Sequence, residues 1–190
     1  MPRIAVVGDS ISAGSPLWDP DPAVRARVEA PDERSQWQWW ARQAEPSLEF
    51  RTSAVYGERT EQIARRLELV LAGADLLVVQ GGINDIAQQR PVEEAARNLE
   101  AMVERGRDVG LAVAVPDVLP WPAGDARAAG EIARLNELIC AINGAIGGVT
   151  HLPFHDTLAG AGFGWSDDGD HPSVEGYRLL GECAARLLAG

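Results

Sequence analysis

The stretch Arg3-Ile4-Ala5-Val6-Val7-Gly8-Asp9-Ser10-Ile11-Ser12 decides how the rest of the chain is interpreted. Its first five residues are mostly apolar, which is typical of a strand that is covered on both faces of a sheet. The glycine and short polar residues that follow are typical of a turn leading into a helix. Because a buried strand followed by a helix is the repeating unit of parallel sheets, this stretch predicts an α/β fold.

Further apolar runs repeat the same pattern along the chain. The five predicted strands are Arg3 to Val7, Leu48 to Ala54, Asp75 to Gln80, Leu111 to Val115 and Val149 to Phe154. Apolar residues spaced by three or four positions predict helices over Ile63 to Leu71, Val92 to Val109 and Ile132 to Ile142, and from Pro172 onward. This alternation predicts a parallel sheet between two helical layers, as one three-layer αβα domain over residues 1–190.

Composition excludes several classes of function. The chain has 190 residues and a net charge of −11, and all 17 of its basic residues are arginine. Without lysine it can form neither a Schiff base nor a P-loop, so pyridoxal enzymes and P-loop nucleotide hydrolases are excluded, and no cofactor is predicted. The excess negative charge opposes binding to nucleic acid and to anionic membrane surfaces. The expected partner is a small-molecule substrate.

Two features of the chain bear on its location in the cell. No segment approaches the ~20 consecutive apolar residues that a membrane span needs. The apolar run before Gly8 is also shorter than the ~7–15 residues of a signal-peptide core. We therefore expect a cytoplasmic protein without a membrane span.

The cysteines and two of the three histidines predict neither a redox site nor a metal site. Cys140 and Cys183 fall within helical apolar patterns, which favours buried thiols. His151 and His155 are four residues apart, and nearby acids could suggest a metal ion. On a strand, however, such residues lie ~13 Å apart, which is too far to share one tetrahedral ion.

Ser15 to Ser35 is the one irregular segment of the chain. It holds four prolines among mixed charges and comes directly after the first predicted strand. Such a composition is typical of a long surface loop or a partly helical lid, and long loops at this position often cover a site. We therefore expect residues 15–35 to form a loop or lid.

Short polar groups follow the predicted strands at four places. They are Gly8 to Ser12, Tyr56 to Glu58, Gly81 to Asp85 and Asp167 to Pro172. In a parallel sheet the carboxyl ends of the strands lie at one edge, where ligands bind. The sequence therefore predicts that these four groups form one site.

Taken singly, each of these residues has an ordinary structural explanation as a cap, a turn or a solvated acid. Together they supply what acyl transfer needs. Ser10 would be the nucleophile and His171 its base, with Asp168 accepting the Nδ1 proton of the histidine. The Asn84 side chain and the backbone N–H groups of Ser10 and Gly57 would stabilise the oxyanion. The neighbouring Asp167 and Asp170 are expected to face solvent.

These blocks together resemble the SGNH (GDSL-type) hydrolases, and the resemblance covers essentially the whole chain. Gly8 to Ser12 is similar to the nucleophile block, Gly57 to the oxyanion glycine, Gly82 to Asp85 to the Gly-x-Asn-Asp block, and Asp168 to Pro172 to the Asp-x-x-His-Pro block. The resemblance implies a flavodoxin-like sheet of order 2-1-3-4-5. It also implies metal-free hydrolysis of esters or thioesters through an acyl-enzyme, with the five site residues in the roles given above. Thr52 stands where many members carry an asparagine.

Tryptophans could line the substrate pocket. Trp37, Trp39 and Trp40 fall on a short predicted helix and are expected to pack in the core. Trp18, Trp121 and Trp165 lie in loops after strands and could rim the site, as aromatic walls that hold an acyl chain or a sugar.

Small carboxylic esters or thioesters are the expected substrates, with carbohydrate O-deacetylation as the alternative within the same chemistry. A metal-dependent phosphoesterase and a non-catalytic α/β binding module are the alternatives from other classes.

Overall fold

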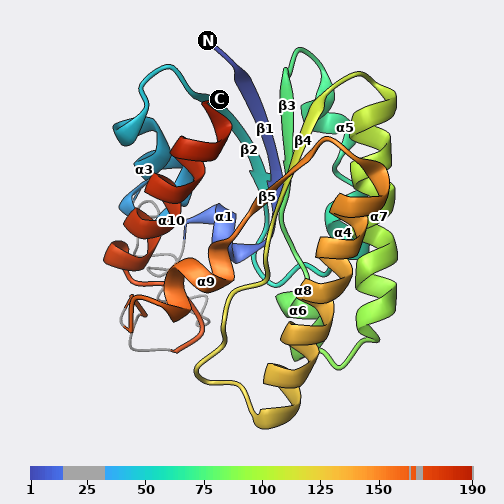
Figure 1. The fold of residues 1–190 in the computed structure, drawn as a ribbon, viewed down its shortest axis with the longest axis vertical. Coiled ribbons are helices and arrows are strands. Elements are labelled where there is room, and N and C mark those ends of the chain that lie inside the picture. The colour runs from blue at the N-terminus through green and yellow to red at the C-terminus, as the bar shows by residue number, and fades with distance from the viewer. Residues whose placement is uncertain (15–32, 163, 166–168, 190) are drawn as a thin grey trace, which may run out of the picture.

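A parallel sheet lies between two layers of helices in a computed structural model that describes residues 1–14, 33–162, 164–165 and 169–189 (Figure 1). Within these residues the strands are β1 (Arg3–Gly8), β2 (Glu49–Ala54), β3 (Leu76–Val79), β4 (Ala112–Pro116) and β5 (Val149–Leu152). Their order is β2-β1-β3-β4-β5, and every adjacent pair is parallel. The predicted α/β class and strand order are confirmed.

The helices are divided between the two faces of the sheet (Figure 1). One face carries α1 (Ser10–Ala13), α3 (Trp37–Ala44), α9 (Phe154–Ala159) and α10 (Val174–Leu188), with the short 3₁₀ helix η1 (Glu33–Ser35) beside α3 and α10. The other face carries α4 (Thr60–Ala64), α5 (Glu68–Leu71), α6 (Ile83–Ala87), α7 (Val92–Asp108) and α8 (Ala126–Ile146).

Each face of the sheet has its own hydrophobic core. Successive residues of a strand point to opposite faces, so Val7 packs in the core beneath α7 and α8 while Val6 packs in the core beneath α3 and α10. Both valines are fully buried. The continuously apolar strands of the sequence are therefore strands covered on both sides, as predicted.

Trp37 fills the centre of the core beneath α3 and α10. Its ring is fully buried and meets the rings of Phe50 and Phe154 edge-on, at centroid distances of 5.6 Å in both cases. The helices α3 and α10 approach closely at Gly181, where an added Cβ would lie 2.6 Å from the Trp37 carbonyl oxygen. The predicted packing role of Trp37 is confirmed.

Three details differ from the sequence expectations. The apolar pattern from Ile63 to Leu71 forms two short helices, α4 and α5, separated by a turn. The last strand ends at Leu152, because Pro153 cannot donate to the sheet and Phe154 starts α9. Cys183 is buried, but Cys140 is exposed, so the expectation of two buried thiols is wrong for Cys140.

Parts of the predicted lid and site fall outside the described residues. These are residues 15–32, which include Trp18, and the acids Asp167 and Asp168. Among the described helices, none combines the length and apolar character needed to cross a membrane.

Candidate active site

Ser10 lies where β1 ends, at the carboxyl edge of the sheet. It is the first residue of α1, and Asp9 caps this helix by accepting a hydrogen bond from the Ile11 N–H group at 3.0 Å. The abrupt change from the apolar strand to Gly8 and Asp9 thus fixes the position of Ser10. Ser10 is 7% exposed, so little of its surface is open to solvent among the described residues.

His171 faces Ser10 from the segment that precedes α10. Its Nε2 atom lies 3.0 Å from the Ser10 Oγ atom, across 161 residues of sequence. Pro172 pairs with Trp165 in an isolated β-bridge, and the Ser173 N–H group donates to the Gly164 carbonyl at 2.7 Å. These contacts hold the histidine segment in place, with Nε2 at hydrogen-bonding distance from the hydroxyl.

Asn84 and Gly57 lie on the adjoining loops. Asn84 is in α6, directly after β3, and one N–H of its side chain donates to the Glu58 carbonyl at 3.1 Å. Gly57 has a φ of +72°, which glycine adopts without strain, and its carbonyl accepts from Gln88 Nε2 at 3.1 Å. The side-chain nitrogen of Asn84 has a second N–H, which leaves it able to donate to another acceptor.

Asp85 connects the loops that carry Gly57 and Asn84. Its carboxylate accepts hydrogen bonds of 2.9 Å from both the N–H and the hydroxyl of Thr60, at the start of α4. Asn98 in α7 donates to the same hydroxyl oxygen at 3.0 Å. Burial raises the pKa of Asp85, while the hydrogen bonds from Thr60 oppose that rise. Asn84 thus faces the candidate site, while Asp85 supports the loops around it.

Arg66, which the sequence analysis missed, joins three of the site's loops. It lies in the turn between α4 and α5, and its guanidinium donates to the Gly8 carbonyl at 3.0 Å and to the Ser53 carbonyl at 2.7 Å. The same group pairs with the Glu58 carboxylate, with Nε at 2.9 Å. The ends of β1 and β2 and the loop beside Gly57 are thereby tied to one side chain.

A buried polar network lies beneath Ser10. Gln80 donates to the Asp9 carboxylate at 2.8 Å and accepts from the Ser12 hydroxyl at 3.0 Å, while Trp37 Nε1 donates to Ser12 Oγ at 3.1 Å. Burial raises the pKa of Asp9 to about 6, against the opposing effects of its hydrogen bonds and of the nearby His171. Buried polar side chains therefore support the turn that carries Ser10.

Thr52 takes part in the same support. Gln38 in α3 donates from Nε2 to both the Thr52 hydroxyl at 3.1 Å and the Ser12 carbonyl at 3.0 Å. Although Thr52 stands where many family members carry asparagine, the Gln38 side chain of α3 still connects β2 to the turn that carries Ser10.

The two described loop tryptophans lie along the histidine segment. The Trp121 Nε1 atom donates to the Asp170 carboxylate at 2.6 Å, and the Ala123 N–H donates to the Gly169 carbonyl at 3.2 Å. Asp170 is exposed, as expected, but it also holds this indole. The loop after β4 is thus fastened to the segment that carries His171, and Trp165 pairs with Pro172 within that segment.

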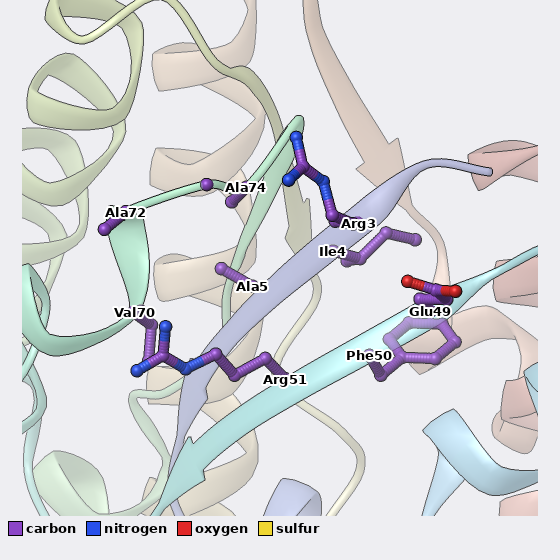
Figure 2. Close-up of a pocket in the computed structure, with 10 residues that line it drawn as sticks. Arg3, Ile4, Ala5, Glu49, Phe50, Arg51, Val70, Ala72 and Ala74 are labelled. Atoms are coloured by element: carbon purple, nitrogen blue, oxygen red, sulfur yellow. The ribbon is translucent and has the colours of Figure 1, made fainter.

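Two cavities among the described residues differ in size, and neither is lined by Ser10 or His171. A cavity of about 10 Å³ is lined by Ile11, Gly81, Leu119 and Asp170, among others. A larger one, of about 310 Å³, lies at the opposite end of the sheet, where β1 and β2 begin. Figure 2 shows Arg3 and Arg51 beside this larger cavity, and the candidate nucleophile and base are not among its lining residues.

Comparison with known proteins identifies the family of this chain. The sequence model of the GDSL-like Lipase/Acylhydrolase family matches residues 6–179, which is most of the chain. The protein is a carboxylic ester hydrolase. It belongs to the GDSL-like lipase/acylhydrolase family. A comparison with curated proteins finds no match.

Solved structures share the fold at low sequence identity. A member of the lipolytic G-D-S-L family from Veillonella parvula has a TM-score of 0.81 and 19% identity, and the alignment covers 98% of each chain. A psychrotrophic esterase from Pseudoalteromonas sp. has a TM-score of 0.75 and 18% identity, over 100% of this chain and 97% of that one. An acetyl-xylooligosaccharide esterase from Geobacillus Stearmophilus has a TM-score of 0.76 and 15% identity, over 100% and 94% of the two chains.

Proposed function

We propose that Ser10 attacks the carbonyl carbon of an ester and that His171 takes its proton. The observation that carries this proposal is the 3.0 Å distance between His171 Nε2 and Ser10 Oγ. A serine hydroxyl is a weak nucleophile unless a base within hydrogen-bonding reach accepts its proton during attack. At this distance a neutral imidazole satisfies that requirement.

The remaining steps use groups of the same edge. The tetrahedral intermediate carries its negative charge on the former carbonyl oxygen, toward which the second N–H of Asn84 and the backbone N–H groups of Ser10 and Gly57 would donate. His171 then gives its proton to the leaving alcohol or thiol, which leaves an acyl group on Ser10. Water, deprotonated by the same histidine, releases the acid and restores the serine.

Asp168 completes the proposed triad. It lies outside the described residues, and its assignment rests on the Asp-x-x-His spacing of the sequence. A carboxylate that accepts from Nδ1–H keeps Nε2 unprotonated toward Ser10 and stabilises the imidazolium formed during attack.

The match of the family over residues 6–179 also supports one domain over the whole chain.

Short acyl esters or thioesters are the proposed substrates. This choice rests on the size of the chain, because one domain of 190 residues has little room beside its sheet for a long acyl tunnel. An acetylated carbohydrate is the second candidate. It is favoured by the Trp121 ring, which Asp170 fixes beside the histidine segment and which could stack on a sugar.

Covalent labelling tests the nucleophile. A fluorophosphonate probe should label the protein at Ser10, and Ser10→Ala should abolish both the label and nearly all turnover. Ser173→Ala, which removes only the cap of α10, is the matched control and should keep the label. Label on another residue, or an active enzyme that takes no label, would overturn the assignment.

A substrate panel separates the candidates. p-Nitrophenyl acyl esters of increasing length, acyl thioesters, acetylated sugars and a phosphate ester are compared at equal concentration. We expect acetyl and butyryl substrates to be hydrolysed fastest and the phosphate ester not at all. Fastest turnover of an acetylated sugar, together with its loss in Trp121→Ala, would favour the O-deacetylase.

A further inference from the structure

Three side chains that bind metal ions in other proteins meet at the β5 edge of the sheet. They are Asp117, which follows β4, Cys140 of α8 and His151 of β5. One ligand atom of each lies within 4.8 Å of the other two. His151 pairs with Val115 in the register of β4 and β5, so both side chains point to the face that α8 covers.

The cluster combines a buried charge with two groups that solvent can reach. The Asp117 side chain is 7% exposed, and its Oδ1 atom lies 2.6 Å from His151 Nε2. The His151 side chain is 37% exposed and Cys140 is exposed. A buried carboxylate destabilises the fold unless a positive group compensates its charge. Because the thiol and the imidazole are exposed, a dissolved ion can reach the carboxylate from their side.

We propose that Asp117, Cys140 and His151 bind one zinc ion. Thiolate, carboxylate and imidazole are the ligand types that zinc prefers, and three protein ligands with one water complete a tetrahedral site. Zinc bonds of roughly 2.0–2.3 Å place neighbouring ligand atoms roughly 3.3–3.7 Å apart, a spacing that small side-chain rotations can reach from the observed cluster.

The charges of the bound state balance. The thiolate and the carboxylate carry one negative charge each, so the two positive charges of zinc make the complex neutral. Burial and the charges of Asp117 and Asp156 raise the pKa of the Cys140 thiol. Binding therefore forms a bond from sulfur to zinc and releases the thiol proton to solvent.

This site is separate from the groups proposed for ester hydrolysis. None of its three ligands takes part in the steps assigned to Ser10 and His171, although Asp117 also lines the cavity of about 10 Å³ beside Ile11. Zinc binding can therefore be measured without reference to turnover, and failure of one proposal leaves the other standing.

Metal binding to the whole protein tests the site. Metal-stripped protein is dialysed against zinc, and bound metal is quantified by elemental analysis. We expect one zinc per chain. Cobalt in place of zinc should give the near-ultraviolet charge-transfer band of a thiolate ligand, which reports directly on Cys140.

Two variants and a matched control locate the site. Cys140→Ser and His151→Gln should each weaken zinc binding by roughly 100-fold or more, since removal of even an outer partner of a metal ligand costs about 10–100-fold. His155→Gln alters a histidine that pairs with Asp156 instead, and it should bind as the wild type does. Absence of stoichiometric zinc, absence of the charge-transfer band, or equal losses in His151→Gln and His155→Gln would overturn the proposal.

Discussion

The Arg66 guanidinium donates to the Gly8 carbonyl at 3.0 Å, and so a residue of the turn after α4 holds the end of the strand that leads to Ser10. Its other partners are the carbonyl and hydroxyl oxygens of Ser53 and the Glu58 carboxylate. The Arg66 and Glu58 side chains are each 17% exposed, so solvent screens their charges only partly. We therefore expect Arg66 to position both the turn that carries Ser10 and the loop beside Gly57.

Arg66→Met should lower both stability and turnover. It removes the donor of the Glu58 carboxylate and of the Ser53 carbonyl, while the Gly8 carbonyl keeps only its bond from the Val55 N–H group, and hydrogen bonds to charged groups are worth about 1.5–3 kcal/mol each. We expect the free energy of unfolding to fall by roughly 2–4 kcal/mol and kcat to fall by at least roughly 10-fold, with a smaller change in KM.

Two further variants check this role. Arg66→Met with Glu58→Gln should recover part of the stability, because it removes the unpaired carboxylate, but should not recover kcat. Arg105→Met breaks the exposed pair with Glu68 and should change the stability little. If turnover follows stability through all of these variants, Arg66 has no positioning role.

Asn84→Ala should impair the chemical step. The substitution removes the proposed oxyanion donor as well as the hydrogen bond to the Glu58 carbonyl. Loss of one such donor typically lowers kcat by roughly 10²–10³-fold, and KM should change little because the charge develops only in the transition state. Steady-state kinetics with a p-nitrophenyl acetate substrate measures the two constants separately.

Asn98→Ala is the matched control for Asn84. It removes a partly buried amide that bonds to Thr60, at the base of the same loops. This variant should keep kcat within a few-fold of the wild type. An effect of Asn84→Ala that is confined to KM would place its side chain in ground-state binding instead.

Much of the fold, and which residues meet at the centre of the candidate site, could be predicted from sequence. Apolar runs mark the strands wherever both faces of a sheet are covered, and this pattern also locates the carboxyl ends of the strands. The order of the strands in the sheet follows from the resemblance to the family. Ser10, Asn84 and His171 were predictable because each comes after a strand or in the motif before the last helix. Their placement at one edge is a consequence of parallel topology.

The support of the site was not predictable in the same way. Arg66 lies within an apolar helical pattern, where an arginine normally indicates a solvent-facing position, and its partners become visible only once α4 and α5 separate. Cys140 follows the fully buried Ile139, but a helix turns about 100° per residue, which is enough to bring the thiol to the surface. Asp117 and His151 meet it only through the register of β4 and β5.

Ester hydrolysis should survive removal of metal. The proposed steps use a hydroxyl, an imidazole and N–H donors, and the proposed zinc ligands take no part in them. We expect kcat/KM after prolonged dialysis with EDTA to remain within about twofold of the untreated value. Loss of activity that one divalent ion restores would instead favour the phosphoesterase class of mechanism.

Asp9 should make the protein less stable as pH rises from about 4 to about 6. Burial raises the pKa of this carboxyl from 3.8 to about 6 in the folded protein, so over that interval the folded state holds more protons than the unfolded state. Stability therefore falls as pH rises, and Asp9 contributes no further change above the folded value. This rise in the pKa of Asp9 corresponds to a change of roughly 3 kcal/mol in the free energy of unfolding, at about 1.4 kcal/mol per pKa unit.

Asp9→Asn isolates this contribution. Asparagine can still accept from the Ile11 N–H group to cap α1, but it carries no charge to desolvate. Urea unfolding at several pH values should show that the difference in unfolding free energy between wild type and variant changes by roughly 2–3 kcal/mol between pH 4 and 6 and then stays constant. Asp75→Asn is the control of opposite sign, because the Arg3 hydrogen bonds lower the pKa of Asp75 below 3.8, so its stabilising contribution is lost only as pH falls below that value and stays constant from pH 4 to 6. Parallel curves for wild type and Asp9→Asn across this interval would show that Asp9 titrates alike in the folded and unfolded chains.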